Sequence, residues 1–209
     1  RSSAASDVYK RQGVIGRIAF NGVDVPLFYT PHGYSFLMKD AGVIKRGIYW
    51  GIEKVFANRD CTIISCSKGE YQESLKLTPN ATYVDNAINA EKLKERLKEV
   101  KEEEHPFTVF TLGRICYQKN PAQFNKIAEA MPNIKFMWIG DGDLRSELSA
   151  PNREVSGWVD RETALKKSIN ADVFVLTSLW EGLPISLLEA MYMKKLCVVS
   201  NVIGNRDVI

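Results

Sequence analysis

Two glutamates eight positions apart, Glu181 and Glu189, frame the segment of the sequence that best suggests chemistry, SLWEGLPISLLEAM. Glu181 precedes a Gly-Leu-Pro-Ile turn, and Glu189 follows about one turn into the helix that the proline opens. Backbone N–H groups at a helix N-terminus attract anions, and a carboxylate beside them can accept two hydroxyl hydrogen bonds from a sugar or a ribose. The alternative is that both carboxylates only complement the helix dipole.

A pair of cations follows the apolar pattern at residues 107–112, which predicts a strand. Arg114 comes just after this strand, and Lys119 stands immediately before an Asn-Pro pair that predicts a helix N-cap followed by proline. Two cations beside a helix N-terminus suit a phosphate, because the exposed N–H groups and the helix dipole also favour negative charge. Taken alone, each side chain is more typical of a solvated surface.

The remaining candidates for chemistry are histidine and cysteine. His32 lies between a proline and a glycine just after a predicted strand, where the backbone can come close to a ligand; a lone histidine there is more often structural or exposed than functional. His105, within EEEHP, is interpreted as solvated. The cysteines form no Cys-x-x-Cys pair and have no histidine at ligand spacing, so buried free thiols in a reducing cytosol are expected at Cys61, Cys66, Cys116 and Cys197.

These residues follow short apolar runs that alternate with helical patterns. Apolar residues at Ile44, Ile48, Ile52, Val55 and Phe56 predict one helix, and Leu93, Leu97 and Val100 predict another. Nearly continuous apolar strands suit a parallel sheet covered on both faces, so the sequence predicts an α/β fold in which polar loops gather at the carboxyl ends of the strands. Strands are expected at residues 26–29, 61–65, 82–84, 107–112, 135–139, around 155, 173–176 and 196–199.

Composition excludes several classes of protein. The chain has 209 residues, of which 45% are hydrophobic and 25% charged, so collagen-like, disordered and disulfide-scaffold classes are excluded. Lysine and arginine (28) against aspartate and glutamate (25) give a net charge of +3, far too small for a charge-driven nucleic-acid binder. No uncharged apolar run approaches the roughly 18 residues of a membrane span. Walker A, G-x-S-x-G, H-E-x-x-H and EF-hand patterns are absent from the sequence.

The chain is expected to hold two domains. A turn-rich stretch between residues 79 and 92 separates two strand–helix series, so residues 13–86 and 87–209 are interpreted as separate domains. Residues 1–12 fit poorly with the strand–helix pattern of the rest of the chain and are interpreted as a non-native leader. The sequence stops within a loop that follows a strand, so both domains are expected to be incomplete.

Taken together, these motifs resemble retaining GT-B glycosyltransferases of family 4. SLWEGLPISLLEAM resembles the family's E-x(7)-E segment, LGRICYQKNP its G-R-x(4)-K phosphate loop, and WIGDGDLRSEL and VSGWV the two segments after that loop. VDNAIN resembles the interdomain linker, with Ala87 where glycine is usual, and TPHGYSF and CSKGE resemble the end of the acceptor-side domain. The residue pattern of this last region is similar to that of bacterial capsule and exopolysaccharide transferases.

The resemblance implies two Rossmann-like parallel-sheet domains, the second binding a UDP- or GDP-sugar without an obligatory metal. Arg114 and Lys119 would bind the diphosphate and Glu189 the ribose, while Glu181 would hold the donor sugar and His32 would lie near its anomeric carbon. Backbone amides of the turn Gly182, Leu183, Pro184 and Ile185 would complete the site. A saccharide or lipid-linked acceptor is implied, in a cytoplasmic protein for which peripheral contact with the inner face of the membrane is an option.

Two rival functions stay open at this point. The chain could be a catalytically incompetent nucleotide-sugar-binding fragment or pseudo-enzyme, because the glycine-rich loop of the acceptor domain is missing from the sequence. A GT-B sugar-nucleotide epimerase is the nearest enzymatic alternative. A NAD-type dehydrogenase is disfavoured, since Gly140-Asp141-Gly142 lacks the third glycine of a dinucleotide fingerprint.

Overall fold

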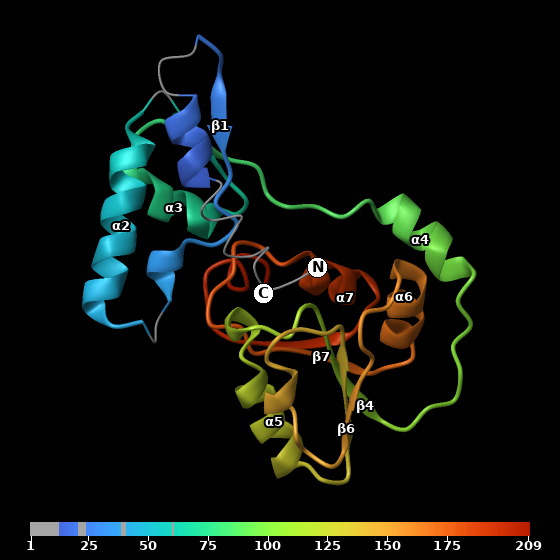
Figure 1. Ribbon diagram of the computed structural model, residues 1–209. Coiled ribbons are helices and arrows are strands. Elements are labelled where there is room, and N and C mark those ends of the chain that lie inside the picture. The colour runs from blue at the N-terminus through green and yellow to red at the C-terminus, as the bar shows by residue number, and fades with distance from the viewer. Residues whose placement is uncertain (1–12, 21–23, 39–40, 60) are drawn as a thin grey trace. The chain divides into compact units, whose positions relative to one another are not determined.

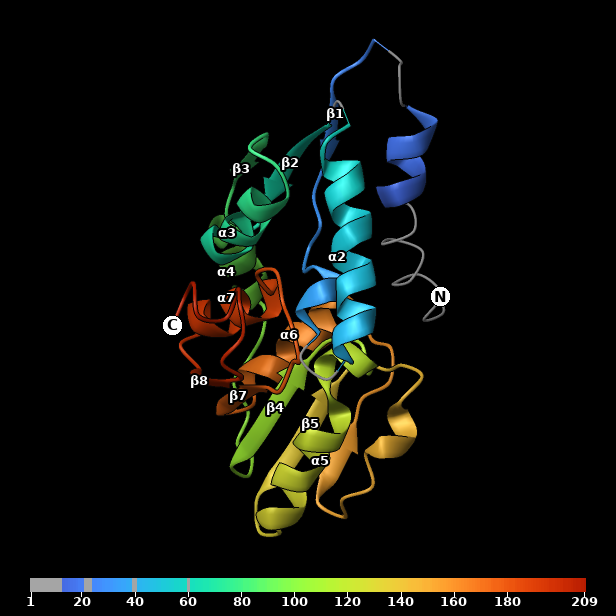
Figure 2. The same cartoon turned by 90° about the vertical axis from the view of Figure 1, so that its left-hand side faces the viewer.

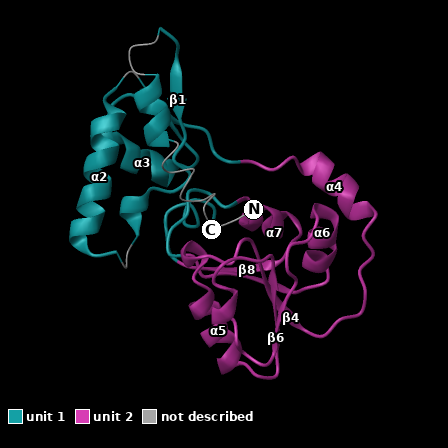
Figure 3. Cartoon of the chain, in the orientation of Figure 1, with its two compact units in different colours: residues 1–86, 179–184, 201–209 teal, residues 87–178, 185–200 magenta. Residues whose placement is uncertain are grey.

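The computed structural model describes residues 13–20, 24–38, 41–59 and 61–209 (Figure 1). The predicted leader, residues 1–12, lies outside the described residues. The chain divides into two compact units, coloured separately in Figure 3. Unit 1 comprises residues 1–86, 179–184 and 201–209, and unit 2 comprises residues 87–178 and 185–200. The domain boundaries drawn from the sequence stay a prediction.

Unit 1 is built on a parallel sheet of order β1-β2-β3. The strands are β1 (Leu27–Tyr29), β2 (Cys61–Ser65) and β3 (Ala81–Tyr83), with Tyr29 opposite Ile63 and Ile63 opposite Ala81. Connections between them contain η1 (Ser35–Leu37), α2 (Val43–Ala57) and α3 (Lys68–Leu77). The side chains at the centre of this unit are Tyr34, Phe36, Ala57, Ile63 and Leu77.

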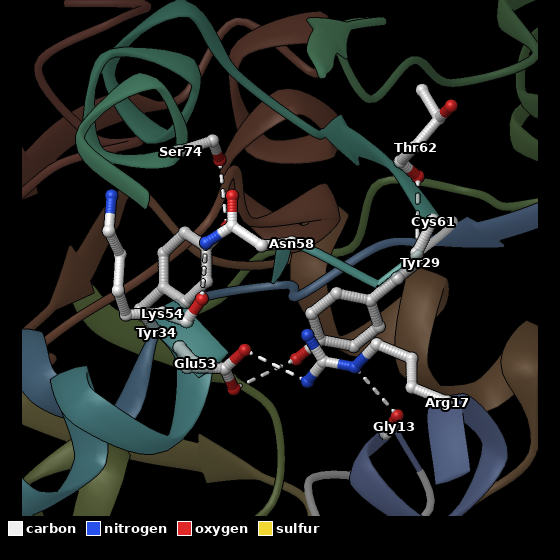
Figure 4. A network of polar contacts seen from close by, with 10 residues as sticks. All are labelled: Gly13, Arg17, Tyr29, Tyr34, Glu53, Lys54, Asn58, Cys61, Thr62 and Ser74. Atoms are coloured by element: carbon white, nitrogen blue, oxygen red, sulfur yellow. Dashed lines mark hydrogen bonds and ion pairs between the residues drawn. The ribbon is translucent and has the colours of Figure 1, made fainter. Parts of the chain in front are cut away.

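A buried polar network ties the first described helical turns to this sheet (Figure 4). Arg17 is 2% exposed; its Nη2 donates to Glu53 Oε2 at 2.9 Å, and its guanidinium lies 4.0 Å from the centre of the Tyr29 ring. The Tyr29 hydroxyl donates to the other Glu53 oxygen at 3.3 Å. Burial, followed by the neighbouring Glu53 charge, raises the pKa of Tyr29 well above its ordinary value. The cation and the ring therefore share one carboxylate inside unit 1.

Unit 2 contains a parallel sheet of order β6-β5-β4-β7-β8. Its order shows that the chain builds outward from β4 in one direction through β5 and β6, and then returns to the other side of β4 for β7 and β8. The strands are β4 (Thr108–Leu112), β5 (Lys135–Ile139), β6 (Arg153–Val155), β7 (Val173–Leu176) and β8 (Leu196–Val199).

Helices flank this second sheet. They are α4 (Ala90–Lys98), η2 (Tyr117–Lys119), α5 (Pro121–Ala130), η3 (Arg145–Glu147), α6 (Arg161–Ile169) and α7 (Ile185–Tyr192). Phe124 of α5 packs edge-to-face on Phe136 and Trp138 of β5, with centroids 5.6 and 5.0 Å away. The ribbon of α5 lies beside β5 in Figure 2. Such aromatic contacts add to the hydrophobic burial that holds α5 on the sheet.

The α/β fold predicted from the sequence is confirmed. Strands form at every predicted location, and β2, β5, β7 and β8 have the predicted bounds. The helix predicted from Ile44, Ile48 and Val55 also forms, but these three side chains are 82%, 58% and 56% exposed. Ala57 instead lies in the core of unit 1. Among the described residues, no helix is both long and apolar enough to cross a membrane.

Candidate functional site

The strand order of unit 2 contains a topological switch point between β4 and β7. Open α/β sheets bind ligands just outside the carboxyl ends of the strands at such a point, because the loops that leave the two strands turn in opposite directions there. Gly113-Arg114 follows β4, and Thr177 follows β7. The fold therefore puts the predicted phosphate loop at the edge of the sheet where a ligand is expected.

Hydrogen bonds fix the backbone of that loop. Thr177 Oγ1 donates to the carbonyl oxygens of Lys119 and Asn120, at 2.9 and 3.1 Å. Asn120 adopts a left-handed conformation, and its side chain accepts from Gln123 N to cap α5, with proline at the first helical position as predicted. A Cβ placed on Gly113 would lie 3.6 Å from Lys119 Cε, so the lysine stem returns toward the start of the loop. Lys119 is thus held at the N-terminal end of α5.

A second loop packs closely against the first. Gly113 N donates to Ile139 O at 3.0 Å, and Ile115 N donates to Asp141 O at 2.8 Å. A Cβ on Gly140 would lie 2.2 Å from Gly113 O, and one on Gly142 would lie 2.1 Å from Ile115 O. These two glycines are therefore required for backbone contact between loops, which explains a G-x-G pattern that is no dinucleotide fingerprint.

Glu189 lies at a pocket of about 490 Å³ in unit 2. Its side chain is 6% exposed and forms a bidentate ion pair with Arg161, whose Nη1 donates to Oε2 at 2.9 Å while Nη2 donates to Oε1. Arg161 is the first residue of α6, and Glu189 lies in α7. Besides this pair, the pocket is lined by Ala87, Ile88, Asn89, Lys92, Leu93, Arg96 and Ile185.

Unit 1 brings His32 together with the segment that contains Glu181. His32 and Gly33 both have left-handed backbones, with φ of 50° and 95°. A Cβ on Gly33 would lie 3.4 Å from the carbonyl carbon of Glu181, and one on Gly182 would lie 3.1 Å from His32 C. The His32 side chain is exposed, whereas Glu181 is 5% exposed. The left-handed turn thus seats the backbone of the loop after β1 directly on Glu181-Gly182.

A buried carboxylate lies beneath this loop. Glu70 Oε1 accepts from Gly33 N at 2.5 Å, and Oε2 accepts from Cys66 N at 2.8 Å and from Cys66 Sγ at 3.2 Å. Burial, followed by the Glu70 charge, raises the pKa of the Cys66 thiol well above its ordinary value. Cys66 is therefore a neutral thiol that donates to a carboxylate.

The structure places the predicted site residues in two groups. Unit 2 holds the two cations and the second glutamate, together with the first residue of α7: Arg114, Lys119, Ile185 and Glu189. Unit 1 holds His32, Glu181, Gly182, Leu183 and Pro184, and Asn86 Nδ2 donates to Leu183 O at 2.8 Å within it. Among the described residues, no group of three His, Cys, Asp or Glu side chains is arranged to hold a metal ion.

Sequence reasoning missed Arg161 and gave no role to Glu70. Asp160 is a readable helix start, and its side chain does accept from Thr163 N, but nothing in the sequence connects the next residue with Glu189. Glu70 lies in a Ser-x-x-Glu pattern that indicates a capping box. The pattern predicts the helix start but not which groups the Glu70 carboxylate contacts.

Residues 92–209, more than half of the chain, match the family model for glycosyl transferases group 1. The chain belongs to this family. The matched segment contains every candidate residue of unit 2, from the phosphate loop after β4 to Glu189 in α7.

Two curated relatives of this chain have names that specify diphosphoundecaprenol-linked substrates. The UDP-Gal:alpha-D-GlcNAc-diphosphoundecaprenol alpha-1,3-galactosyltransferase of Escherichia coli is 32% identical over 93% of this chain and 57% of its own length. A Campylobacter jejuni alpha-1,4-N-acetyl-D-galactosaminyltransferase, whose acceptor is also linked to diphosphoundecaprenol, is 34% identical over 44% of this chain and 28% of its own. The chain thus spans little more than half the length of the first of these relatives.

Solved structures share the fold at low identity. Sucrose-phosphate synthase from Thermosynechococcus elongatus superposes with a TM-score of 0.72 at 17% identity, over 92% of this chain and 54% of that one. Anabaena HepE in complex with UDP-glucose superposes with a TM-score of 0.68 at 14% identity, over 99% of this chain and 64% of that one. The α/β fold is therefore of GT-B type.

Proposed function

We propose that this protein is a retaining family 4 glycosyltransferase that moves a sugar from a nucleotide sugar to a saccharide or lipid-linked acceptor. The observation that carries the proposal is the switch point of unit 2. There, the loop that holds Arg114 and Lys119 leaves β4 within a chain that belongs to the group 1 family. The E. coli relative and the UDP-glucose complex of HepE support the choice of a nucleotide-sugar donor.

In the proposed donor site, one set of residues binds the diphosphate of the nucleotide and another binds its ribose. Arg114, Lys119 and the N-terminal N–H groups of α5 would bind the diphosphate, because cations and helix termini favour negative charge. Glu189 would accept the ribose hydroxyls. Its oxygens each have two lone pairs, so the ion pair with Arg161 leaves room for these hydrogen bonds.

Glu181, His32 and the turn of residues 182–185 are proposed to hold the transferred sugar. In the reaction, the bond from the anomeric carbon to the diphosphate oxygen breaks, and its electron pair leaves with the nucleoside diphosphate. The acceptor oxygen forms the new bond on the same face of the sugar, and its proton passes to the departing diphosphate. Because negative charge grows on the leaving group, the cations of the phosphate loop would provide most of the catalysis, without an obligatory metal.

We propose a lipid-linked diphosphate sugar as the acceptor and a place in surface polysaccharide synthesis. The E. coli and C. jejuni relatives support this acceptor class, because their names specify diphosphoundecaprenol-linked substrates. A lipid-anchored acceptor stays at a bilayer, so the proposed location is the cytoplasm, in peripheral contact with the inner face of the membrane.

A transfer assay on the full-length protein tests the proposal. UDP-galactose, UDP-glucose, UDP-N-acetylgalactosamine and GDP-mannose are each offered with a synthetic N-acetylglucosaminyl diphosphate lipid, and the release of nucleoside diphosphate is followed. Acceptor-dependent release supports a transferase. Conversion of the donor to an isomer without acceptor supports an epimerase, and binding without any turnover supports a pseudo-enzyme. Proton NMR of the product reads the new anomeric configuration, and inversion would rule out retention.

A further inference from the structure

The Glu70 carboxylate does not make the contact that its position in the sequence predicts. Ser67 is the N-cap of α3, and Glu70 N donates to its Oγ at 3.1 Å, as in a capping box. In a capping box the glutamate side chain reaches back to the N–H of the N-cap residue itself. Here it accepts instead from Cys66 N and from Gly33 N, which lies 37 positions earlier in the sequence. The carboxylate therefore accepts hydrogen bonds from loops outside its own helix.

Burial makes this arrangement costly unless the hydrogen bonds are kept. Glu70 is 0% exposed, and an ionised carboxylate inside a protein is tolerated only where donors replace the lost water. The donors here are two backbone N–H groups and one thiol. Each of the two N–H groups belongs to a loop that follows a strand, β1 for Gly33 and β2 for Cys66.

Both loops also touch the Glu181-Gly182 segment. A Cβ on Gly182 would lie 2.5 Å from Cys66 Sγ and 3.1 Å from Gly33 N. A Cβ on Gly33 would lie 3.4 Å from Gly182 N. The N–H that donates to Glu70 Oε1 belongs to Gly33, the residue that follows His32 at the left-handed turn. Glu70 thus binds the two loops on which Glu181-Gly182 rests.

We propose that Glu70 is a positioning residue for sugar transfer, which fixes the His32-Gly33 turn and the Cys66 loop against Glu181-Gly182. This inference rests on the proposed function. Glu70 itself touches no substrate; it sets the backbone from which His32 and Glu181 extend. The helix cap does not use the carboxylate, because the cap contact comes from the Glu70 backbone N–H, which donates to Ser67 Oγ.

Glu70→Gln tests the proposal in the full-length protein. The amide keeps the shape but replaces one acceptor oxygen with a donor, which would face the N–H of Gly33 or of Cys66. With UDP-galactose and the diphosphate lipid as substrates, kcat is expected to fall on the order of 100-fold, the loss that a small misplacement causes. The donor KM is expected to stay within about twofold, because the nucleotide contacts lie elsewhere. Glu73→Gln, on the same helix in an ion pair with Lys76, is the matched control and should leave both constants unchanged.

A double variant separates positioning from stability. If Glu70 acts through the turn at His32, then adding Glu70→Gln to His32→Ala should lower kcat by much less than Glu70→Gln does alone. Faster hydrogen exchange at the Gly33 amide should accompany the loss. An unchanged kcat in folded Glu70→Gln, or full additivity with His32→Ala, would overturn the proposal. If Glu70→Gln does not fold, Glu70→Asp takes its place, and failure of both to fold would assign Glu70 to stability alone. An inactive parent enzyme would instead refute the proposed function.

Discussion

Arg161 and Glu189 form a bidentate ion pair across two helices of unit 2, between the first residue of α6 and a residue one turn into α7. The glutamate side chain is 6% exposed and the arginine side chain 41%. The cation therefore reaches from a partly open surface to a nearly buried carboxylate. A planar guanidinium fixes the plane of the carboxylate as well as its charge, which no lysine would do equally well.

Arg161→Ala should weaken nucleotide binding even though Arg161 itself is not among the residues expected to touch the donor. Without the guanidinium, the proposed ribose ligand Glu189 loses its fixed orientation, and UDP affinity should drop about 10-fold, the value of a charge-assisted contact. Isothermal titration calorimetry with UDP and with 2′-deoxy-UDP measures this. The loss should be smaller for the deoxy nucleotide. Lys166→Ala, on the same helix in an exposed pair with Glu103, is the control; equal losses for both nucleotides would contradict the prediction.

Substitutions of the two glutamates in the E-x(7)-E segment should have different effects on UDP binding. Glu189→Ala is expected to weaken free UDP and the intact donor by similar factors, because both contain the ribose. Glu181→Ala is expected to leave UDP binding nearly unchanged and to lower turnover, because its contact is with the transferred sugar. Calorimetric titration with UDP beside the transfer assay decides between them. Equal loss of UDP binding in both variants would show that Glu181 is misplaced in the proposed site.

Lys119→Ala should weaken donor binding by about 10- to 150-fold, since it removes a charge-assisted contact with the diphosphate of roughly 1.5–3 kcal/mol. The lysine backbone is held by Thr177, so the loop should keep its shape when the side chain is shortened. Lys126→Ala, an exposed lysine on α5, is the control for a change of net charge. If the Lys119 variant folds and binds UDP as tightly as the parent, then the lysine is only a surface charge.

Chelation should leave nucleotide binding unchanged. The proposed site matches the diphosphate with Arg114, Lys119 and helix N–H groups, so no divalent cation is needed to balance its charge. The affinity of the full-length enzyme for UDP is measured before and after treatment with EDTA. A tenfold loss that is restored by adding Mg²⁺ or Mn²⁺ would overturn the metal-free assignment.

The strands could be predicted because their apolar runs are short and bounded by glycine and polar residues. VFVL and KFMWI give β7 and β5 with the predicted bounds, since a strand buried on both faces has no polar interior positions to confuse the pattern. The helix at residues 43–57 shows the limit of this reasoning. Its apolar positions predict the helix correctly, but periodicity does not say which face the rest of the unit covers, and Ile44 is 82% exposed.

The site could be predicted only where function is carried by a local pattern. Residues near one another in sequence, such as Lys119 and the cap of α5, follow from spacing alone. The pair of Arg161 with Glu189 joins residues 28 positions apart, and it depends on how α6 and α7 pack against the sheet. The left-handed turn at His32 lies against Glu181-Gly182, which is far away in the sequence. Such features arise from tertiary packing, which a linear pattern does not encode.

The final prediction concerns the buried cation of unit 1. Glu53→Gln removes the carboxylate that Arg17 and Tyr29 share, and the Arg17 side chain, which is 1% exposed, would be left as a buried charge without its counterion. Breaking one side of a buried pair typically costs about 3–5 kcal/mol, whereas replacing both sides by uncharged groups costs much less. Urea unfolding should therefore show a large loss of stability for Glu53→Gln and partial recovery in the double variant Arg17→Met/Glu53→Gln. Glu73→Gln, which breaks the more exposed pair with Lys76, should lose no more than about 1 kcal/mol. If the double variant is less stable than Glu53→Gln alone, then Arg17 stabilises unit 1 through its packing on the Tyr29 ring rather than through its charge.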